Sequence, residues 1–115
     1  MTIEELRIRI DALDRQLVEL LSERARAAQT IGNLKAATSL PVYEPEREKI
    51  IYANVRAANK GPLPDIELTH IYERIIDVMR ALQRNELASE RNARAAASGH
   101  GTGPETAATK IGDKP

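Results

Sequence analysis

The sequence predicts an all-α fold built from three helices, of which the N-terminal one is very long. Apolar residues recur at alternating spacings of three and four in two long segments, as they do on one face of a helix. Prolines and a glycine between residues 38 and 64 separate these segments, and no alternation typical of strands occurs. The length of 115 residues allows one domain.

The first helix is predicted to span residues 3–37. Thr2 and Glu5 match a capping box, which satisfies the free amides of a helix start. Such a helix is about 50 Å long, so the rest of the chain is too short to cover its apolar face. We expect a second copy of the chain to cover it. That face consists of Leu6, Ile10, Leu13, Leu17, Leu20, Ala27, Ile31 and Leu34.

Two further helices follow. Pro45 suits the first turn of a helix that is predicted over residues 45–58. The run Asn59-Lys60-Gly61-Pro62 is a helix stop, because glycine adopts the left-handed conformation and proline cannot continue a helix. The third helix is predicted to begin with Asp65 as its N-cap and to end near Ala88.

Composition predicts the domain boundary and the location of the protein. Residues 1–90 are predicted to form the helical domain and residues 91–115 a disordered tail, because four of the six glycines fall at its end. The chain has no cysteine, no signal-peptide pattern and no membrane-spanning apolar run, which predicts a cytoplasmic protein. Its 17 basic and 17 acidic residues cancel, so we expect no nucleic-acid or membrane partner.

Cationic residues interrupt the apolar face of the first helix. Arg24 lies between Leu20 and Ile31, where it either snorkels to water or joins Lys35 in holding one small anion. Lys35 lies about 20° from the same helix face. Arg7 lies about 25 Å from Arg24 along the helix. It is therefore either a solvated charge or a ligand contact contributed by a second, antiparallel chain.

The other two helices carry further polar candidates. Glu44, Arg47 and Glu48 share a helix face, as either a surface ion-pair cluster or part of a site. Gln83 follows Met79 by one turn near the apolar face, where its amide needs a partner. No metal-ligand cluster and no nucleophile beside a base is recognisable, so we expect no metal or cofactor.

Taken together, these residues resemble the small all-helical (AroQ-type) bacterial chorismate mutases. The run Leu6-Arg7-Ile8-Arg9-Ile10-Asp11-Ala12-Leu13-Asp14 resembles the opening of that family, and Gly32-Asn33-Leu34-Lys35 resembles its Gly-x-x-Lys. Residues 23–25, 42–48 and 59–63 match further family segments. The resemblance implies three-helix chains that intertwine in a homodimer with two identical sites. It also implies a cofactor-free isomerase that converts chorismate to prephenate in phenylalanine and tyrosine biosynthesis.

The resemblance assigns substrate-binding roles to five of the candidates. Arg7 of the partner subunit and Arg24 would bind the two carboxylates of chorismate, with Arg47 supporting the site. Glu48 would bind the substrate hydroxyl, with Glu44 nearby.

The resemblance places two of the remaining candidates at the reacting atoms. Lys35 and Gln83 would bond the ether oxygen, where negative charge develops as the bond breaks. Met79 departs from the family pattern, since many relatives carry a serine there. One contact to a substrate carboxylate is therefore in question, although methionine could instead narrow the pocket.

Two other functions share parts of this pattern. An isochorismate-pyruvate lyase has the same fold but typically has an apolar residue after the arginine of the second helix, so Glu48 favours the mutase. A non-catalytic helical interaction or regulatory module would have little reason to retain the cationic residues together with Glu48 and Gln83. Loss of chorismate with a product that acid converts to phenylpyruvate would identify the mutase, release of pyruvate would indicate the lyase, and absence of turnover would indicate the non-catalytic module.

Overall fold

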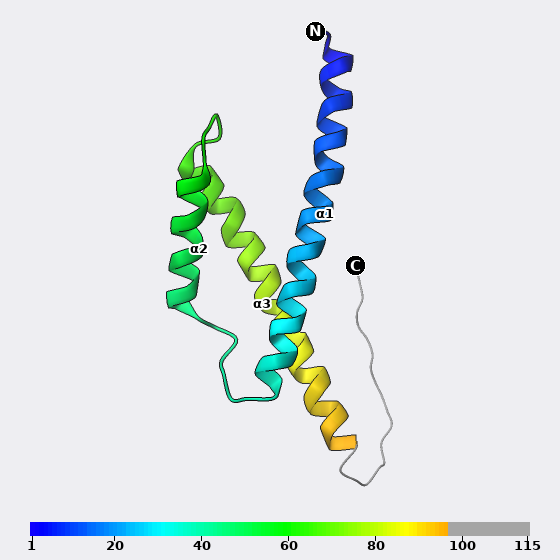
Figure 1. Ribbon diagram of the computed structural model, residues 1–115, viewed down its shortest axis with the longest axis vertical. Helices are drawn as coiled ribbons and strands as arrows, with labels where there is room; N and C mark the ends of the chain where they lie inside the picture. Colours follow the sequence, from blue (N-terminus) through cyan, green and yellow to red (C-terminus); the bar gives the residue numbers. More distant parts are fainter. Residues whose placement is uncertain (97–115) are drawn as a thin grey trace.

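The computed structural model describes residues 1–96, which form three α-helices (Figure 1). α1 spans Ile3–Ala36, α2 spans Pro45–Ala58 and α3 spans Asp65–Ala95. No strand occurs within residues 1–96. The predicted all-α class is therefore confirmed, while most of the predicted tail, residues 97–115, lies outside the described residues.

α1 begins with the predicted capping box. The Thr2 hydroxyl accepts a hydrogen bond from the Glu5 backbone N–H at 3.1 Å, and the Glu5 carboxylate accepts one from the Thr2 N–H at 2.8 Å. The bond from the Thr2 backbone lowers the pKa of Glu5, because it favours the charged form. The helix then runs without interruption, since no glycine precedes Gly32 and no proline precedes Pro41.

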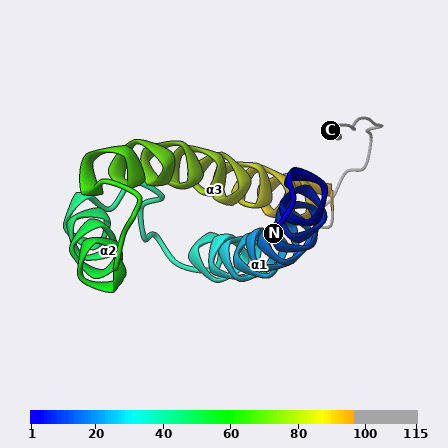
Figure 2. The same cartoon turned by 90° about the horizontal axis from the view of Figure 1, so that it is seen from above.

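α1 and α2 both pack against α3 and make no helix packing with each other (Figure 2). The C-terminal half of α1 crosses α3, and its N-terminal half projects beyond the other helices (Figure 1). The buried apolar core is small and lies at this crossing. It consists of Ala28 and Ala36 of α1 and Ile76 and Met79 of α3.

The crossing is close because α1 carries a glycine at the contact. A Cβ atom at Gly32 would lie 3.0 Å from the Cα and the carbonyl oxygen of Gln83, and 3.0 Å from the Cβ of Glu86. These are mostly backbone atoms that cannot move aside cheaply. Glycine therefore sets how near α1 and α3 approach, and with it the distance between Lys35 and Gln83.

The connection between α2 and α3 confirms the predicted stop but corrects the predicted cap. Gly61 adopts a φ of 70°, and the Gly61–Pro62 bond is cis. Asp65 is the first helical residue, not the N-cap, and Pro64 at the N-cap position has no side-chain acceptor. The Asp65 carboxylate instead accepts a hydrogen bond from the Asn59 amide at 2.7 Å.

α3 continues to Ala95, beyond its predicted end near Ala88. Residues 88–95 contain neither glycine nor proline and are mostly good helix formers. The composition change that suggested a boundary begins only at Gly99, outside the described residues.

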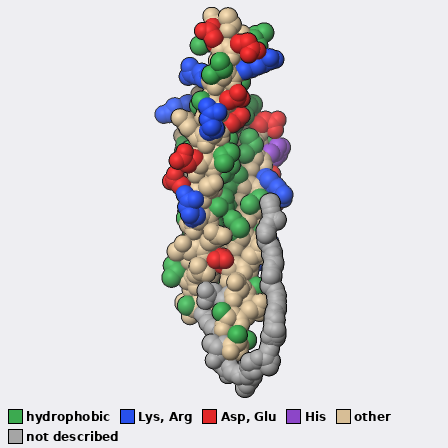
Figure 3. All heavy atoms as spheres, turned by 90° about the vertical axis from the view of Figure 1, so that its right-hand side faces the viewer, with side chains coloured by type: hydrophobic (Ala, Val, Ile, Leu, Met, Phe, Trp, Pro, Cys, Tyr) green, Lys and Arg blue, Asp and Glu red, His purple; other side chains and the backbone are tan. Residues whose placement is uncertain are grey.

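The apolar face of α1 is largely uncovered within one chain. Leu13, Leu17 and Leu20 are 51%, 54% and 62% exposed. Figure 3 shows hydrophobic side chains gathered in a band on one face of the molecule. A patch of this extent on a folded chain marks a contact surface. None of the helices in residues 1–96 has the length and apolar character needed to cross a bilayer.

We expect Gly32→Val to lower the free energy of unfolding by about 1–3 kcal/mol, because the added methyl groups force α1 away from the α3 backbone. Urea denaturation at fixed protein concentration measures this change. Asn33→Val is the matched control, since Asn33 is the exposed neighbour of Gly32 and receives the same side chain. The control should change the free energy by no more than about 0.5 kcal/mol. Equal losses in both variants would contradict the close crossing.

Candidate functional site

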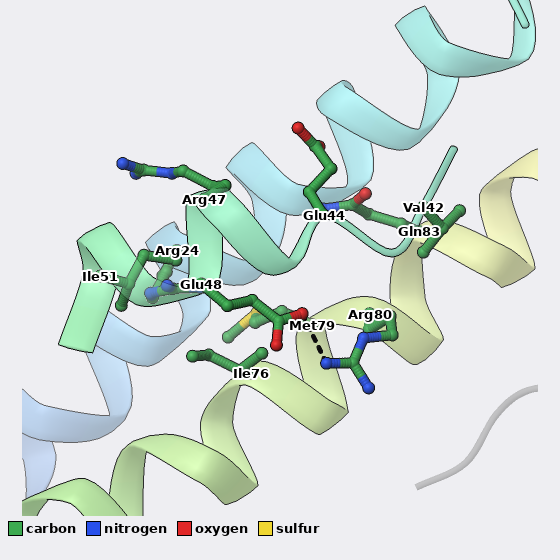
Figure 4. A pocket seen from close by; sticks show the side chains of 10 residues that line it. All are labelled: Arg24, Val42, Glu44, Arg47, Glu48, Ile51, Ile76, Met79, Arg80 and Gln83. Atoms are coloured by element: carbon green, nitrogen blue, oxygen red, sulfur yellow. Dashed lines mark hydrogen bonds and ion pairs between the residues drawn. The ribbon is translucent and has the colours of Figure 1, made fainter. Parts of the chain in front are cut away.

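A cavity of about 70 Å³ lies where α1, α2, α3 and the segment before α2 meet (Figure 4). All three helices contribute to its walls, which combine cationic, acidic and apolar side chains. The lining residues are Arg24, Val42, Glu44, Arg47, Glu48, Ile51, Ile76, Met79, Arg80 and Gln83.

Lys35 does not line this cavity but bonds two residues that do, and it is the buried charged residue of the described chain, 5% exposed. Its ammonium group donates a hydrogen bond to the Gln83 side-chain oxygen at 3.0 Å. It also forms an ion pair with the Glu44 carboxylate. Lys35 therefore joins the end of α1 to α3 and to the residue that precedes α2.

The contact with Lys35 fixes which end of the Gln83 amide is available. The Gln83 oxygen accepts from Lys35, and its NH2 group has no partner among the side chains that the structure describes, so this group is free to donate. The sequence predicted that this interior amide needs a partner, and the structure supplies Lys35. The Lys35 ammonium and the Gln83 NH2 group are therefore two neighbouring donors, one charged and one neutral.

Glu48 lies on the first turns of α2 and is 19% exposed at its side chain. Its Oε2 accepts a hydrogen bond from Nη2 of Arg80 at 2.5 Å. This bond raises the pKa of Arg80, so the guanidinium stays charged. Glu48 therefore lines the cavity as a carboxylate paired with Arg80. The dashed line in Figure 4 marks this pair.

Arg80 is a residue of the site that was not predicted from the sequence. It lies one residue after Met79 and three before Gln83, just off the apolar face of α3. The sequence feature that could have indicated its role is its position, because a cationic side chain next to the apolar face of a helix can contact the element that packs on that side. In this fold α2 packs there, which only the tertiary structure reveals.

Arg24 and Arg47 line the same cavity from different helices. Neither guanidinium has an ion pair or hydrogen bond to a side chain within residues 1–96. In Figure 4 the Arg47 guanidinium extends away from the pair formed by Glu48 and Arg80. The cavity therefore holds unneutralised positive charge, which suits an anionic ligand.

Arg7 is the one predicted site residue that the chain does not bring to the cavity. It lies near the start of α1, its side chain is 69% exposed, and its guanidinium contacts Glu4 at 3.4 Å. Met79 forms an apolar wall and is 6% exposed. All the other candidates from the sequence either line the cavity or, like Lys35, bond residues that line it.

The family model described as chorismate mutase type II matches residues 6–84. A bifunctional chorismate mutase/prephenate dehydratase of Aquifex aeolicus is 38% identical over 86 residues, which cover 71% of this chain and 24% of that protein. The chain therefore spans about a quarter of the bifunctional relatives that it matches.

Two shorter proteins match over nearly their whole length. A chorismate mutase of Methanocaldococcus jannaschii is 31% identical over 91 residues, which cover 78% of this chain and 92% of that protein. The solved structure of a chorismate mutase from Thermus thermophilus aligns with a TM-score of 0.70 and 36% identity, over 71% of this chain and 93% of that one.

We expect Lys35→Ala to lower the free energy of unfolding by about 1–3 kcal/mol, because it removes a buried stem and leaves the Gln83 oxygen without its donor. Chemical denaturation measures the loss. Lys49→Ala is the matched control, since Lys49 is 74% exposed and pairs with Glu46 on the surface of α2. Its effect should stay within about 0.5 kcal/mol. A loss as large in the control would argue against a structural role for the buried ammonium.

Proposed function

This chain belongs to the chorismate mutase type II family, and we propose that it catalyses the rearrangement of chorismate to prephenate. The observation that carries the proposal is a pair of donors, the Lys35 ammonium and the free NH2 of Gln83, which are joined by a hydrogen bond where Gln83 lines the cationic cavity. The substrate carries two carboxylates and an ether oxygen, and the cavity offers groups suited to each.

Charge supports the match between cavity and substrate. Three arginines line the cavity and Lys35 bonds two of its lining residues, against the carboxylates of Glu44 and Glu48. The four positive and two negative charges leave a net charge of +2, which balances the −2 charge of the chorismate dianion. We assign the two substrate carboxylates to Arg24 and to Arg7 of the second subunit, with Arg47 supporting the site, because guanidinium groups bind carboxylates with defined orientation.

The reaction needs orientation and charge stabilisation more than proton transfer. Breaking the ether bond ahead of forming the new carbon bond places negative charge on the ether oxygen. Lys35 and Gln83 are already fixed by their mutual hydrogen bond, so they stabilise this charge without reorganising. Holding the flexible dianion in a compact conformation lowers the barrier further.

The carboxylates have separate proposed tasks. Glu48 binds the substrate hydroxyl through the oxygen that Arg80 does not use. Glu44 pairs with Lys35 and so keeps the ammonium directed into the site. Met79 lines the pocket as an apolar wall where many relatives have serine.

The proposed active unit is an intertwined homodimer. An apolar groove of about 590 Å³ lies between α1 and α3, lined among others by Leu17, Leu21, Ile75 and Val78. The exposed apolar face of α1 has the composition and length to fill such a groove in a second copy. An antiparallel arrangement brings Arg7 of one chain toward the cavity of the other, which completes the site.

The proposal is limited to the mutase reaction. The chain matches only about a quarter of the bifunctional relatives, so their prephenate dehydratase activity is not proposed for it. The cytoplasmic location stays a prediction from the sequence.

We expect the purified chain to convert chorismate to a product that acid turns into phenylpyruvate. The loss of the ultraviolet absorbance of chorismate measures the rate. Lys35→Ala should lower kcat by about 100-fold or more, because a preorganised donor at the ether oxygen is lost. Lys49→Ala serves as the active control. Absence of turnover by the wild-type chain would refute the mutase, and release of pyruvate from isochorismate would instead identify the lyase.

Mixing inactive Arg7→Ala chains with inactive Lys35→Ala chains should restore activity, because one site of each mixed dimer then contains both side chains. Full exchange at equal concentrations gives about a quarter of the wild-type sites, measured as kcat per chain. Lys35→Ala chains mixed with Gln83→Ala chains are the control. These two residues belong to the same site of one chain, so no intact site forms. Equal behaviour of both mixtures, with exchange demonstrated, would place Arg7 outside the site.

A further inference from the structure

Arg80 is the charged lining residue of the cavity that the proposed reaction leaves without a task. Its side chain is 22% exposed, and its Nε is buried without a hydrogen-bond partner within residues 1–96. A long cationic side chain is rarely held this way unless its contacts fix it in place.

Three contacts fix the Arg80 guanidinium. Its Nη2 bonds Glu48 of α2 at 2.5 Å, and its Nη1 contacts Asp77 one turn earlier on α3 at 3.4 Å. The guanidinium carbon also lies over the Tyr43 ring, 5.1 Å from the centroid, which is the range of a cation–π contact. Arg80 therefore joins α3 to α2 and to the segment that connects α1 with α2.

The contact with Tyr43 links Arg80 to the other acidic residue of the site. Tyr43 immediately precedes Glu44, which forms the ion pair with Lys35. The guanidinium thus holds both the carboxylate of Glu48 and the segment that delivers the carboxylate of Glu44.

If Arg80 were removed, other cationic side chains of the same cavity could pair with the Glu48 carboxylate. Arg24 and Arg47 line it and have no side-chain partner within the described residues. A carboxylate that is 19% exposed needs a partner, so a released Glu48 would turn toward these arginines. It would then leave the position from which it binds the substrate hydroxyl.

We propose that Arg80 is a positioning residue that holds one oxygen of Glu48 and thereby presents the other to the ring hydroxyl of the substrate. This inference rests on the proposed function. It predicts that the contribution of Arg80 depends on both Glu48 and the substrate hydroxyl, whereas a purely structural contribution would depend on neither.

The test compares kcat/KM of wild type, Arg80→Leu, Arg80→Lys and Glu48→Gln with chorismate and with an analogue that lacks the ring hydroxyl. Arg80→Leu should lose about tenfold or more with chorismate, as expected for a charged hydrogen bond, and less than about threefold with the analogue. Arg80→Lys should recover part of the loss, because its ammonium keeps a positive charge near Glu48 but not the planar guanidinium over Tyr43. In the Glu48→Gln background, Arg80→Leu should change kcat/KM by less than about twofold.

Arg84→Leu is the matched control, since Arg84 is exposed one turn later on the same helix. Its kcat/KM should equal that of wild type.

Equal losses for chorismate and the analogue, or an undiminished loss in the Glu48→Gln background, would overturn the positioning role. If Arg80→Leu does not fold, Arg80→Gln takes its place in the same comparisons, since its uncharged amide also lacks the guanidinium that pairs with Glu48. An inactive wild-type chain overturns the proposed function and this inference together, whereas an active wild type with unaffected Arg80→Leu overturns the inference alone.

Discussion

The buried ammonium of Lys35 is the interaction on which the arrangement of the site depends. A cation that is 5% exposed requires partners, and it finds them in Gln83 on α3 and Glu44 before α2. Satisfying this one charge therefore joins the end of α1 to the segment before α2 and to α3, where Gln83 lies 48 residues further along the chain. The close approach at Gly32 makes the contact possible, because a larger residue would hold α1 away from Gln83.

Two networks share the cavity, and each uses one carboxylate to hold one cation. Lys35 is paired with Glu44, and Arg80 is paired with Glu48. Arg24 and Arg47 stay unpaired among the described residues, so they are the groups free to receive an anionic ligand. Because Glu44 and Glu48 are paired with Lys35 and Arg80, the positive charges of Arg24 and Arg47 remain available although carboxylates line the same cavity.

A single chain leaves both the apolar face of α1 and the proposed site incomplete, and a second copy of the chain would complete both. The apolar face of α1 is exposed along most of its length. Arg7 belongs to the first turns of α1 and does not line the cavity, and the N-terminal half of this helix projects beyond the other helices. A second copy that covers the face also supplies the arginine. In the proposed dimer, folding and formation of the site are one process, since the same helix serves both.

The sequence by itself determined the three helices and the polar residues on their faces, because helical periodicity, caps and proline stops are local properties. It thus placed Arg24 and Lys35 on the same face of the first helix and identified Gln83 as an interior amide. It did not identify the end of α3, although residues 88–95 are mostly good helix formers, or the role of Asp65, whose carboxylate bonds Asn59 of the preceding connection. Only the tertiary structure showed that Arg80 reaches Glu48 and Tyr43. That contact depends on which flank of α3 is covered by α2, and no spacing within one helix records this.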